Sequence, residues 1–301
     1  MNIEQLNTTF GLAGKLRFLT GKGDLPMIEI ANDKAQALIS VYAGQVLSYA
    51  PRGAADDVLF LSGRAYFQDG KAIKGGIPVC WPWFGADPEG RGRPAHGFVR
   101  NRPWRVLATD RVAGGGTLVE LGLTDDQNTR EIWPQAFELV LRITVAETLG
   151  LELVTRNLGT EPLSISQALH TYFRIGDVDH VRVLGLDGVT YLDKVDGGAS
   201  KEQSGPVTVA GEVDRIYTGV RGELIIDDPA LRRRIRITPA GSASAVVWNP
   251  GAKIAAAMID LGDDDYRHML CVETANAASD TRKIPAGGEH RLAAVYTVEA
   301  Y

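Results

Sequence analysis

The chain has 301 residues and a net charge of −5, and it is 45% hydrophobic and 23% charged. These values lie near the averages of globular proteins, so they exclude a disordered or fibrous chain. The negative charge, and the lack of a basic run longer than Arg232–Arg234, disfavour binding to nucleic acid. The N-terminus lacks the pattern of a signal peptide, and no apolar run approaches the roughly 20 residues of a membrane helix. We therefore expect a cytoplasmic protein with no membrane or nucleic-acid partner.

Apolar and polar residues alternate with a period of two along much of the chain, which predicts β-strands. In chain order, the expected strands are residues 27–30, 37–42, 58–61, 117–123, 137–146, 149–157, 163–172, 216–220, 223–226, 245–248, 255–259, 269–273 and 292–298. Glycines 114–116 indicate a hairpin turn, and only residues 126–133 have the pattern of a short helix. Because Gly and Pro are dispersed rather than gathered in a linker, we expect one domain, residues 1–301, of the all-β class, with packed sheets in a sandwich.

The longest irregular stretch, residues 75–103, contains five prolines, six glycines and four aromatic residues. Between Arg64 and Arg105 there are eight basic and three acidic residues, against the negative charge of the whole chain. Long loops in compact domains are commonly functional, and aromatic rings stack on the C–H faces of sugars. An anionic sugar would use both features, although core aromatics and solvated arginines would give the same sequence. The residues concerned are the rings of Trp81, Trp83, Phe84 and Phe98, the donors Lys74, Arg91, Arg93, Arg100 and Arg102, and His96.

A histidine and a glutamate each stand in an apolar strand-like stretch, His170 in QALHTYF and Glu273 in MLCVETANA. A titratable group in such a place needs a partner or takes part in proton chemistry. By alternation, His170 shares a small, polar face with Ser166 and Ala168, which suits the floor of a cleft better than a packed core. The alternatives are a structural histidine and a glutamate paired with an arginine. If the two side chains meet, they form an acid/base pair.

Taken together, the segments IKGGIPVCWPWFG, HGFVRNRPW, QALHTYF, VDRIY, VVWNPG and CVETAN resemble the aldose 1-epimerase (mutarotase) superfamily, specifically its glucose-6-phosphate 1-epimerase branch. The segments occur in the family's order, and with the flanking strands the resemblance covers nearly the whole chain. It implies a large antiparallel β-sandwich, the galactose mutarotase-like supersandwich, with the cleft on one sheet. Lysine replaces the family's common arginine at position 74, which keeps the charge but loses the bidentate fork. The resemblance implies catalytic roles for His170 and Glu273, sugar contacts from His96 and Asp214, and phosphate contacts from Lys74 and Arg100.

Interconversion of the α and β anomers of a hexose 6-phosphate needs one base and one acid, without a cofactor or a metal. We expect Glu273 to take the proton from O1, and His170, held protonated by the nearby carboxylate, to protonate O5. The ring then opens, the C1–C2 bond rotates and the ring recloses. The expected partner is a small sugar phosphate, glucose 6-phosphate above all, and the protein is expected to be a monomer or a weak homodimer.

Two other functions remain open. In a metal-dependent sugar isomerase, His96, His170 and Glu273 would supply two histidines and one carboxylate, although the HxH pair of cupin metal sites is absent. A non-catalytic carbohydrate-binding protein would need the aromatic rings but no acid/base pair. Cys80 and Cys271, each flanked by apolar residues, are too few for a disulfide framework or a zinc cluster and are expected to be buried thiols.

Overall fold

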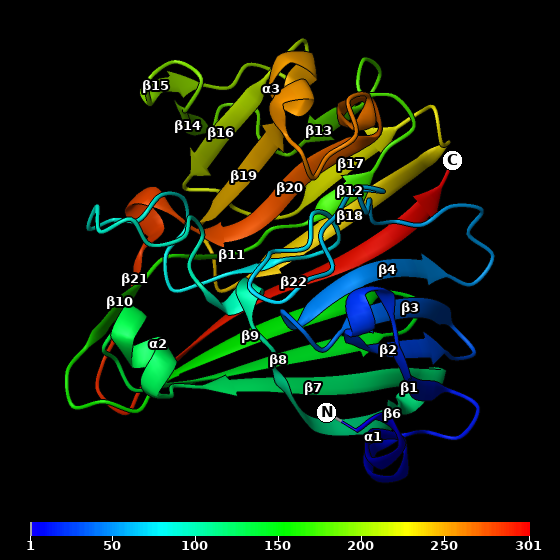
Figure 1. Cartoon of the computed structure of the whole chain (residues 1–301). Coiled ribbons are helices and arrows are strands. Elements are labelled where there is room, and N and C mark those ends of the chain that lie inside the picture. The colour runs from blue at the N-terminus through cyan, green and yellow to red at the C-terminus, as the bar shows by residue number, and fades with distance from the viewer. Residues whose placement is uncertain (1) are drawn as a thin grey trace.

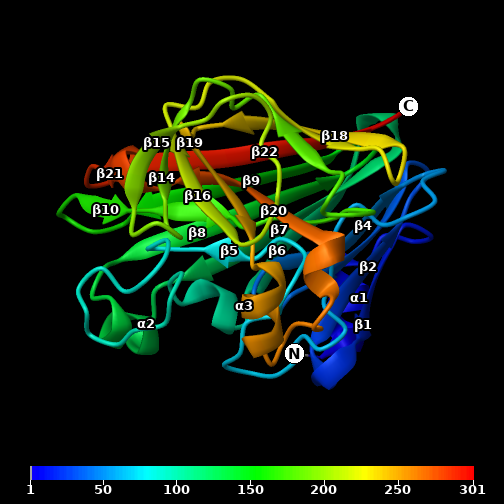
Figure 2. The ribbon, with the colours of Figure 1, turned by 90° about the horizontal axis from the view of Figure 1, so that it is seen from above.

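Two eight-stranded antiparallel sheets pack against each other and make up most of the molecule (Figure 1, Figure 2). The computed structural model describes residues 2–301. We name the two sheets after a central strand of each, the β20 sheet and the β22 sheet. A hydrophobic core of buried aliphatic and aromatic side chains from both sheets lies between them. The all-β sandwich predicted from the sequence is therefore confirmed.

In the β20 sheet the strands follow in space as β15 (Ala199–Glu202), β14 (Thr190–Asp193), β16 (Val213–Thr218), β19 (Ser244–Asn249), β20 (Met269–Asn276), β11 (Gln167–Leu169) and β5 (Val79–Cys80), and β12 (Tyr172–Arg174) also pairs with β20. In the β22 sheet the order is β13 (Arg182–Leu184), β17 (Leu224–Asp228), β18 (Arg233–Ala240), β22 (Glu289–Ala300), β9 (Leu149–Asn157), β8 (Phe137–Val145), β7 (Gly116–Thr124) and β6 (Arg105–Val112).

Smaller elements complete the chain. A four-stranded sheet, blue in Figure 1, consists of β1 (Leu16–Thr20), β2 (Pro26–Ala31), β3 (Ala35–Ser40) and β4 (Gln45–Pro51), and β10 (Leu163–Ile165) pairs with β21 (Arg282–Ile284). The α-helices are α1 (Ile3–Phe10), α2 (Gln127–Ile132) and α3 (Gly251–Ala257), and the 3-10 turns are η1 (Lys22–Asp24), η2 (Val99–Asn101), η3 (Ala113–Gly115), η4 (Asp265–His268) and η5 (Ala278–Asp280). Among residues 2–301, none of the helices is both long and apolar enough to cross a membrane.

Strand β8 illustrates why the chain folds into these layers. Leu141 and Ile143 point into the core and are fully buried, while Arg142 on the opposite face pairs with Glu120 and Glu152 of the neighbouring strands. Burial of a large aliphatic side chain contributes about 1.5–3 kcal/mol, whereas an exposed ion pair contributes at most about 1 kcal/mol. The apolar side chains therefore decide which face of the strand turns inward.

Residues 255–259 do not form the predicted strand, because residues 255–257 are the C-terminal end of helix α3 and the chain then turns. Asn249 fixes the start of the helix: its Oδ1 accepts from the N–H of Gly251, and its Nδ2 donates to the backbone oxygen of Met269. Alanine, the strongest helix former, fills much of α3. A pattern of apolar residues this short does not distinguish a strand from a helix.

The predicted helix at 126–133 is confirmed as α2 with Asp126 as its N-cap, and glycines 114–116 lie in the hairpin between β6 and β7.

The predicted strand at 163–172 is divided into β10 and β11, and β12 begins at its last residue. The division follows a change of partners, since β10 pairs with β21 whereas β11 lies between β5 and β20. Between β11 and β12, His170 donates its backbone N–H to the oxygen of Pro78. The predicted strand at 58–61 forms only isolated bridges, which pair Leu59 with Phe173 and Leu61 with Gly75.

Candidate active site

A cleft of about 570 Å³ opens on the face of the β20 sheet that points away from the β22 sheet. This volume is within the range of small-molecule sites. The strands of the β20 sheet form its floor, and the long loop forms one wall. The six side chains to which the family resemblance assigns catalytic or binding roles are all among its lining residues, which are Lys74, Phe84, Gly85, Ala86, Ala95, His96, Arg100, His170, Tyr172, Lys194, Asp214, Ile216, Val246, Trp248, Met258 and Glu273.

Cross-strand register arranges the floor in two rows. Every second residue of a strand faces the same side, and the pairing of neighbouring strands then aligns these residues across the sheet. The first row runs through Ile216, Val246, Glu273 and His170, and the second runs through Asp214, Trp248, Cys271 and Tyr172.

His170 lies opposite Glu273 in the first row. Strands β11 and β12 keep the same offset against β20 on either side of the break, so the register passes through it and places the two side chains next to each other. His170 Nδ1 is 3.4 Å from Glu273 Oε1. Within residues 2–301, neither His170 Nδ1 nor Glu273 Oε2 has a hydrogen-bond partner. The structure thus brings together the two titratable groups and leaves them free to act on a ligand.

Burial sets the charge state of this pair, since His170 is 7% exposed and Glu273 1%. Burial, reinforced by a histidine and two basic side chains nearby, lowers the pKa of His170 well below its ordinary value. Burial, reinforced by Asp214, raises the pKa of Glu273 well above its ordinary value. The prediction that the carboxylate holds His170 protonated near neutral pH is therefore wrong, because burial and the nearby positive charges both disfavour the imidazolium. Burial thus favours a neutral imidazole and a protonated carboxyl in this pair.

His96 stands on the wall beside this pair, with its ring centre 5.5 Å from that of His170. Its Nδ1 accepts a hydrogen bond from the backbone N–H of Gly85 at 3.3 Å. An imidazole that accepts at Nδ1 carries its hydrogen on Nε2. Burial, together with the charges of Arg100 and Lys74, lowers the pKa of His96 to about 3. His96 is therefore a neutral hydrogen-bond donor throughout the physiological pH range.

Lys74 and Arg100 bring positive charge to the lining of the cleft, and both charges act on His170. Arg100, in η2, donates from Nη2 to the backbone oxygen of Ala95 at 3.0 Å, and its buried Nε has no partner within residues 2–301. Lys74 Nζ lies 3.5 Å from Asp260 Oδ1, too far for a good hydrogen bond. Both cations therefore keep donors for an anion.

Asp214 and Lys194 lie at the opposite end of the floor. Burial raises the pKa of Asp214, and the charge of Lys194 opposes this shift. The backbone N–H of Lys194 donates to the oxygen of Asp214 at 2.8 Å, which extends the second row by one strand. Sequence reasoning missed Lys194, because nothing in YLDKV distinguishes it from a lysine in a surface turn.

The aromatic surface of the cleft differs from the prediction. Of the four rings proposed for sugar stacking, Phe84 alone lines the cleft, and the missed residues Trp248 and Tyr172 supply the other rings. Alternation along VVWNP places Trp248 on one face with Val246, but only the register against β20 shows that this face is the floor. The other three proposed rings, which are buried in the core, are Trp81, Trp83 and Phe98.

Three of the five proposed basic donors lie outside the lining of the cleft and have other partners. Arg91 pairs with Glu89, Arg93 pairs with Asp87, and Arg102 lies over the ring of Phe98.

Cys80 and Cys271 are free, buried thiols, as predicted. Among residues 2–301, no group of three or more His, Cys, Asp or Glu side chains is arranged to hold a metal ion, and His96, His170 and Glu273 are no exception.

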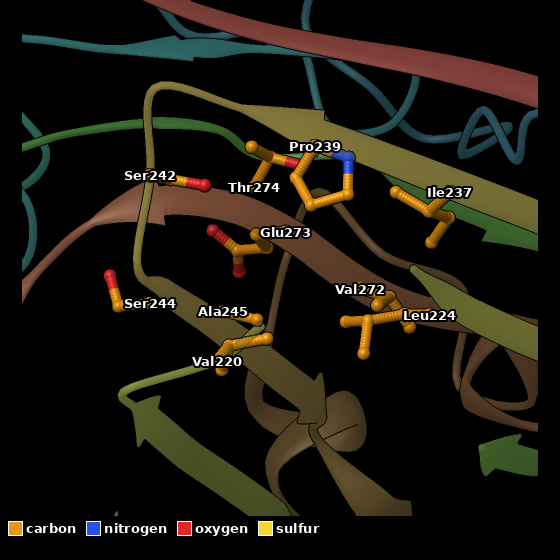
Figure 3. Close-up of a pocket in the computed structure, with 10 residues that line it drawn as sticks. All are labelled: Val220, Leu224, Ile237, Pro239, Ser242, Ser244, Ala245, Val272, Glu273 and Thr274. Carbon is orange, nitrogen blue, oxygen red and sulfur yellow. The ribbon is translucent and has the colours of Figure 1, made fainter. Parts of the chain in front are cut away.

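A second, much smaller cavity lies between the two sheets (Figure 3). Its volume is about 10 Å³, which holds at most one water molecule. Ile237 and Leu224 of the β22 sheet line one side, and Val272 and Ala245 of the β20 sheet line the other. The larger cleft, and not this cavity, is therefore the candidate ligand site.

Comparison with known proteins places the chain in a family. The family model described as aldose 1-epimerase matches residues 26–297. A protein of Escherichia coli (strain K12) named "Putative glucose-6-phosphate 1-epimerase" is 36% identical over 262 residues, which are 87% of this chain and 86% of that protein. A protein of Cenchrus ciliaris with the same name is 37% identical over 250 residues, which are 79% of this chain and 74% of that protein.

Solved structures agree with this placement. The crystal structure of "a putative mutarotase" from Salmonella typhimurium matches with a TM-score of 0.90 and 31% identity, over 99% of both chains. A galactose mutarotase-like protein from Clostridium acetobutylicum has a TM-score of 0.74 at 14% identity, over 95% of this chain and 98% of that one, which shows a common fold alone. The mutarotase-like sandwich and the isomerase class predicted from the sequence are confirmed, and this chain belongs to the aldose 1-epimerase family.

Proposed function

We propose that this protein interconverts the α and β anomers of a hexose 6-phosphate, glucose 6-phosphate above all, by acid/base ring opening that needs no cofactor or metal. The observation that carries the proposal is the pair of His170 and Glu273, 3.4 Å apart on the floor of a cleft that also holds Lys74 and Arg100. The names of the Escherichia coli and Cenchrus ciliaris relatives support a 6-phosphate substrate.

The connectivity of the sugar suggests where its phosphate lies. O5 is bonded to C5, which carries C6 and the phosphate, so the group that protonates O5 must lie on the phosphate side of C1. Lys74 and Arg100 both act on the charge state of His170, whereas the charges that act on Glu273 are those of Asp214 and Arg100. This difference favours His170 as the acid at O5 and Glu273 as the base at O1.

The resting pair and the reactive pair hold the same number of protons. Transfer of one proton from Glu273 to His170 gives the carboxylate and the imidazolium that the reaction needs. A phosphate dianion bound at Lys74 and Arg100 would offset two of the charges that lower the pKa of His170, and so favour this transfer. Substrate binding thereby prepares the base and the acid.

Ring opening then balances without a net gain of protons. Glu273 accepts the proton of the O1 hydroxyl, the O–H electron pair forms the C1=O double bond, the C1–O5 bond breaks, and O5 takes the proton of His170. Rotation about C1–C2 presents the other face of the aldehyde, and the reverse transfers close the ring as the other anomer. Each cycle returns both side chains to their starting state.

The remaining lining residues have proposed roles in binding. His96 donates from Nε2 to a sugar hydroxyl, and Asp214 accepts from another. The half-buried indole of Trp248 offers an apolar face for the C–H groups of the ring. We further propose that residues 1–301 form one domain and that the protein is a cytoplasmic monomer or weak homodimer.

A panel of substrates tests the function. Anomer exchange is measured by NMR saturation transfer for glucose, galactose and mannose 6-phosphates and for the free sugars. We expect acceleration of the 6-phosphates, and we expect Arg100→Ala to lose about 10- to 100-fold on them, the range for one charge-assisted hydrogen bond, and less on free hexoses. Equal losses on both would contradict the phosphate role. Loss of activity on chelation would favour a metal-dependent isomerase, and binding without accelerated exchange would favour a carbohydrate-binding protein.

A further inference from the structure

The wall that carries His96 is held by a buried ion pair outside the cleft. Arg93 donates from Nε to Asp87 Oδ1 at 3.0 Å and from Nη2 to the same oxygen at 2.5 Å. The two side chains are only 8% and 6% exposed. Asp87 also accepts the backbone N–H groups of Glu89, Arg91 and Arg93 itself. One carboxylate thus fixes the whole turn from residue 87 to residue 93.

Arg93 also ties this turn to the rest of the molecule. Its guanidinium lies 4.3 Å from the centre of the Trp83 ring and donates to the backbone oxygen of Ile132, the last residue of α2, at 3.2 Å. Trp83 in turn donates its indole N–H to the oxygen of Pro94 at 2.9 Å. Arg93 thus connects the turn at residues 87–93 to Trp83 and to helix α2.

The two ends of the same turn meet at His96. The N–H of His96 donates to the oxygen of Gly85 at 2.7 Å, and the N–H of Gly85 donates to His96 Nδ1 at 3.3 Å. His96 has a φ of +62°, a left-handed backbone conformation that a residue with a side chain adopts only when its surroundings impose it. The turn that Asp87 and Arg93 fix is therefore closed by the hydrogen bonds that determine the tautomer of His96.

We propose that Asp87 and Arg93 form a latch that positions His96 as a neutral donor, with its hydrogen on Nε2, at the wall of the cleft. Both are positioning residues, since neither lines the cleft. The consequence for catalysis rests on the proposed function, whereas the state of the His96 ring does not.

The groups that face His96 determine how its pKa changes when the contacts of Asp87 and Arg93 are lost. The charged groups are Lys74 and Arg100, and the titratable ring beside it is His170. Both cations oppose a proton on His96, but burial is the largest cause of its low pKa. If the wall loosens, His96 becomes hydrated and loses the hydrogen bond to Nδ1, so its pKa rises toward the ordinary value of about 6.5.

The test follows the His96 ring by NMR of ring nitrogen-15 between pH 4 and pH 8. In the parent protein we expect a single neutral Nε2–H form that does not titrate in this range. In Asp87→Asn and Arg93→Ala we expect titration between about pH 5 and pH 7, together with a new acidic limb in kcat/KM for glucose 6-phosphate. Arg93→Lys keeps the charge but loses the bidentate geometry of the guanidinium. Its His96 titration should be intermediate between that of the parent protein and that of Arg93→Ala.

Arg91→Ala is the matched control, because Arg91 lies two residues away in the same turn and its pair with Glu89 is exposed. It should leave the His96 signals unchanged. A neutral, non-titrating His96 in folded Asp87→Asn would overturn the latch, and so would an equal effect of Arg91→Ala. If Arg93→Ala does not fold, Asp87→Asn decides. An inactive parent protein would count against the proposed function but not against the latch, which the NMR signals test on their own.

Discussion

At the scale of single residues, the cross-strand pairing of His170 with Glu273 explains how two titratable groups can lie side by side in a buried site. His170 and Glu273 have opposite tendencies on burial, since the imidazole loses its proton and the carboxyl keeps one. A neutral imidazole beside a protonated carboxyl has no net charge, which makes their burial far less costly than that of two separate ions. The proton of the carboxyl is the one that the proposed reaction passes to His170.

The opposite pKa shifts of His170 and Glu273 predict how activity depends on pH. As pH falls, the neutral imidazole of His170 becomes protonated while the carboxyl of Glu273 stays protonated, so the pair contains no base. As pH rises, Glu273 loses its proton while the imidazole stays neutral, so the pair contains no imidazolium to act as the acid. Because the pKa of His170 is lowered and that of Glu273 is raised, kcat/KM should form a bell with a plateau around neutral pH, and its limbs belong to the pair. A single rise through about pH 6.5, the value for an unperturbed histidine, would contradict this account.

Removal of the positive charge of Arg100 should change the pKa of the His170 imidazole. The positive charge of Arg100 lowers the pKa of His170, so Arg100→Met should raise it, and the His170 ring signals should titrate at higher pH in an NMR experiment. Arg91→Met removes an equal charge from an exposed pair outside the cleft and serves as the control. Indistinguishable His170 titrations in the two variants would show that Arg100 does not act on this site.

At the scale of elements, β20 shows what the sequence can predict and what it cannot. Alternation in MLCVETAN places Cys271 and Glu273 on one face, and the structure agrees. Alternation does not reveal the lateral neighbours, because pairing between strands far apart in sequence decides them. The meeting of His170 with Glu273 therefore came from the resemblance to a family, and Trp248, which only register brings to the cleft, was missed.

The long loop shows a second limit of sequence reasoning. Its composition indicated a functional segment, and His96 and Arg100 of the loop, with Lys74 just before it, do line the cleft. Composition does not show which rings turn inward, and Trp81 packs in the core with its ring centre 4.5 Å from that of Phe137. The side chains of a loop follow no period, so their directions depend on tertiary contacts that a pattern does not encode.

The close packing of Gly76 against the backbone of Val46 gives a testable prediction for this loop. Its φ is +61°, and a Cβ there would lie 2.1 Å from the backbone oxygen of Val46, so Gly76→Ala must displace the backbone next to Lys74. We expect it to lower the free energy of unfolding by more than about 2 kcal/mol and to weaken turnover of 6-phosphates, as measured by urea denaturation and anomer exchange. Gly70→Ala, with φ +75° but open space around its Cβ, should cost only about 1 kcal/mol. Equal losses in the free energy of unfolding for the two variants would contradict the close contact between Gly76 and the backbone of Val46.

At the scale of the whole molecule, each sheet has a separate task. The β22 sheet covers one side of the core and carries ion pairs such as Arg142 with Glu120 on its outer face. The β20 sheet covers the other side and presents the cleft on its free face. A floor of paired strands holds side chains more rigidly than loops do. The fold class was predictable because alternation is a property of every strand, whereas the extent of the single domain stays a prediction.

The central claim, that His170 and Glu273 exchange the protons of ring opening, is tested most directly by one measurement. NMR saturation transfer between the α and β anomers of glucose 6-phosphate is recorded with the parent protein, with His170→Ala and with Glu273→Gln, each shown to be folded. We predict fast exchange with the parent protein and exchange at the rate of buffer alone with either variant. Exchange at the parent rate in either variant would contradict the account.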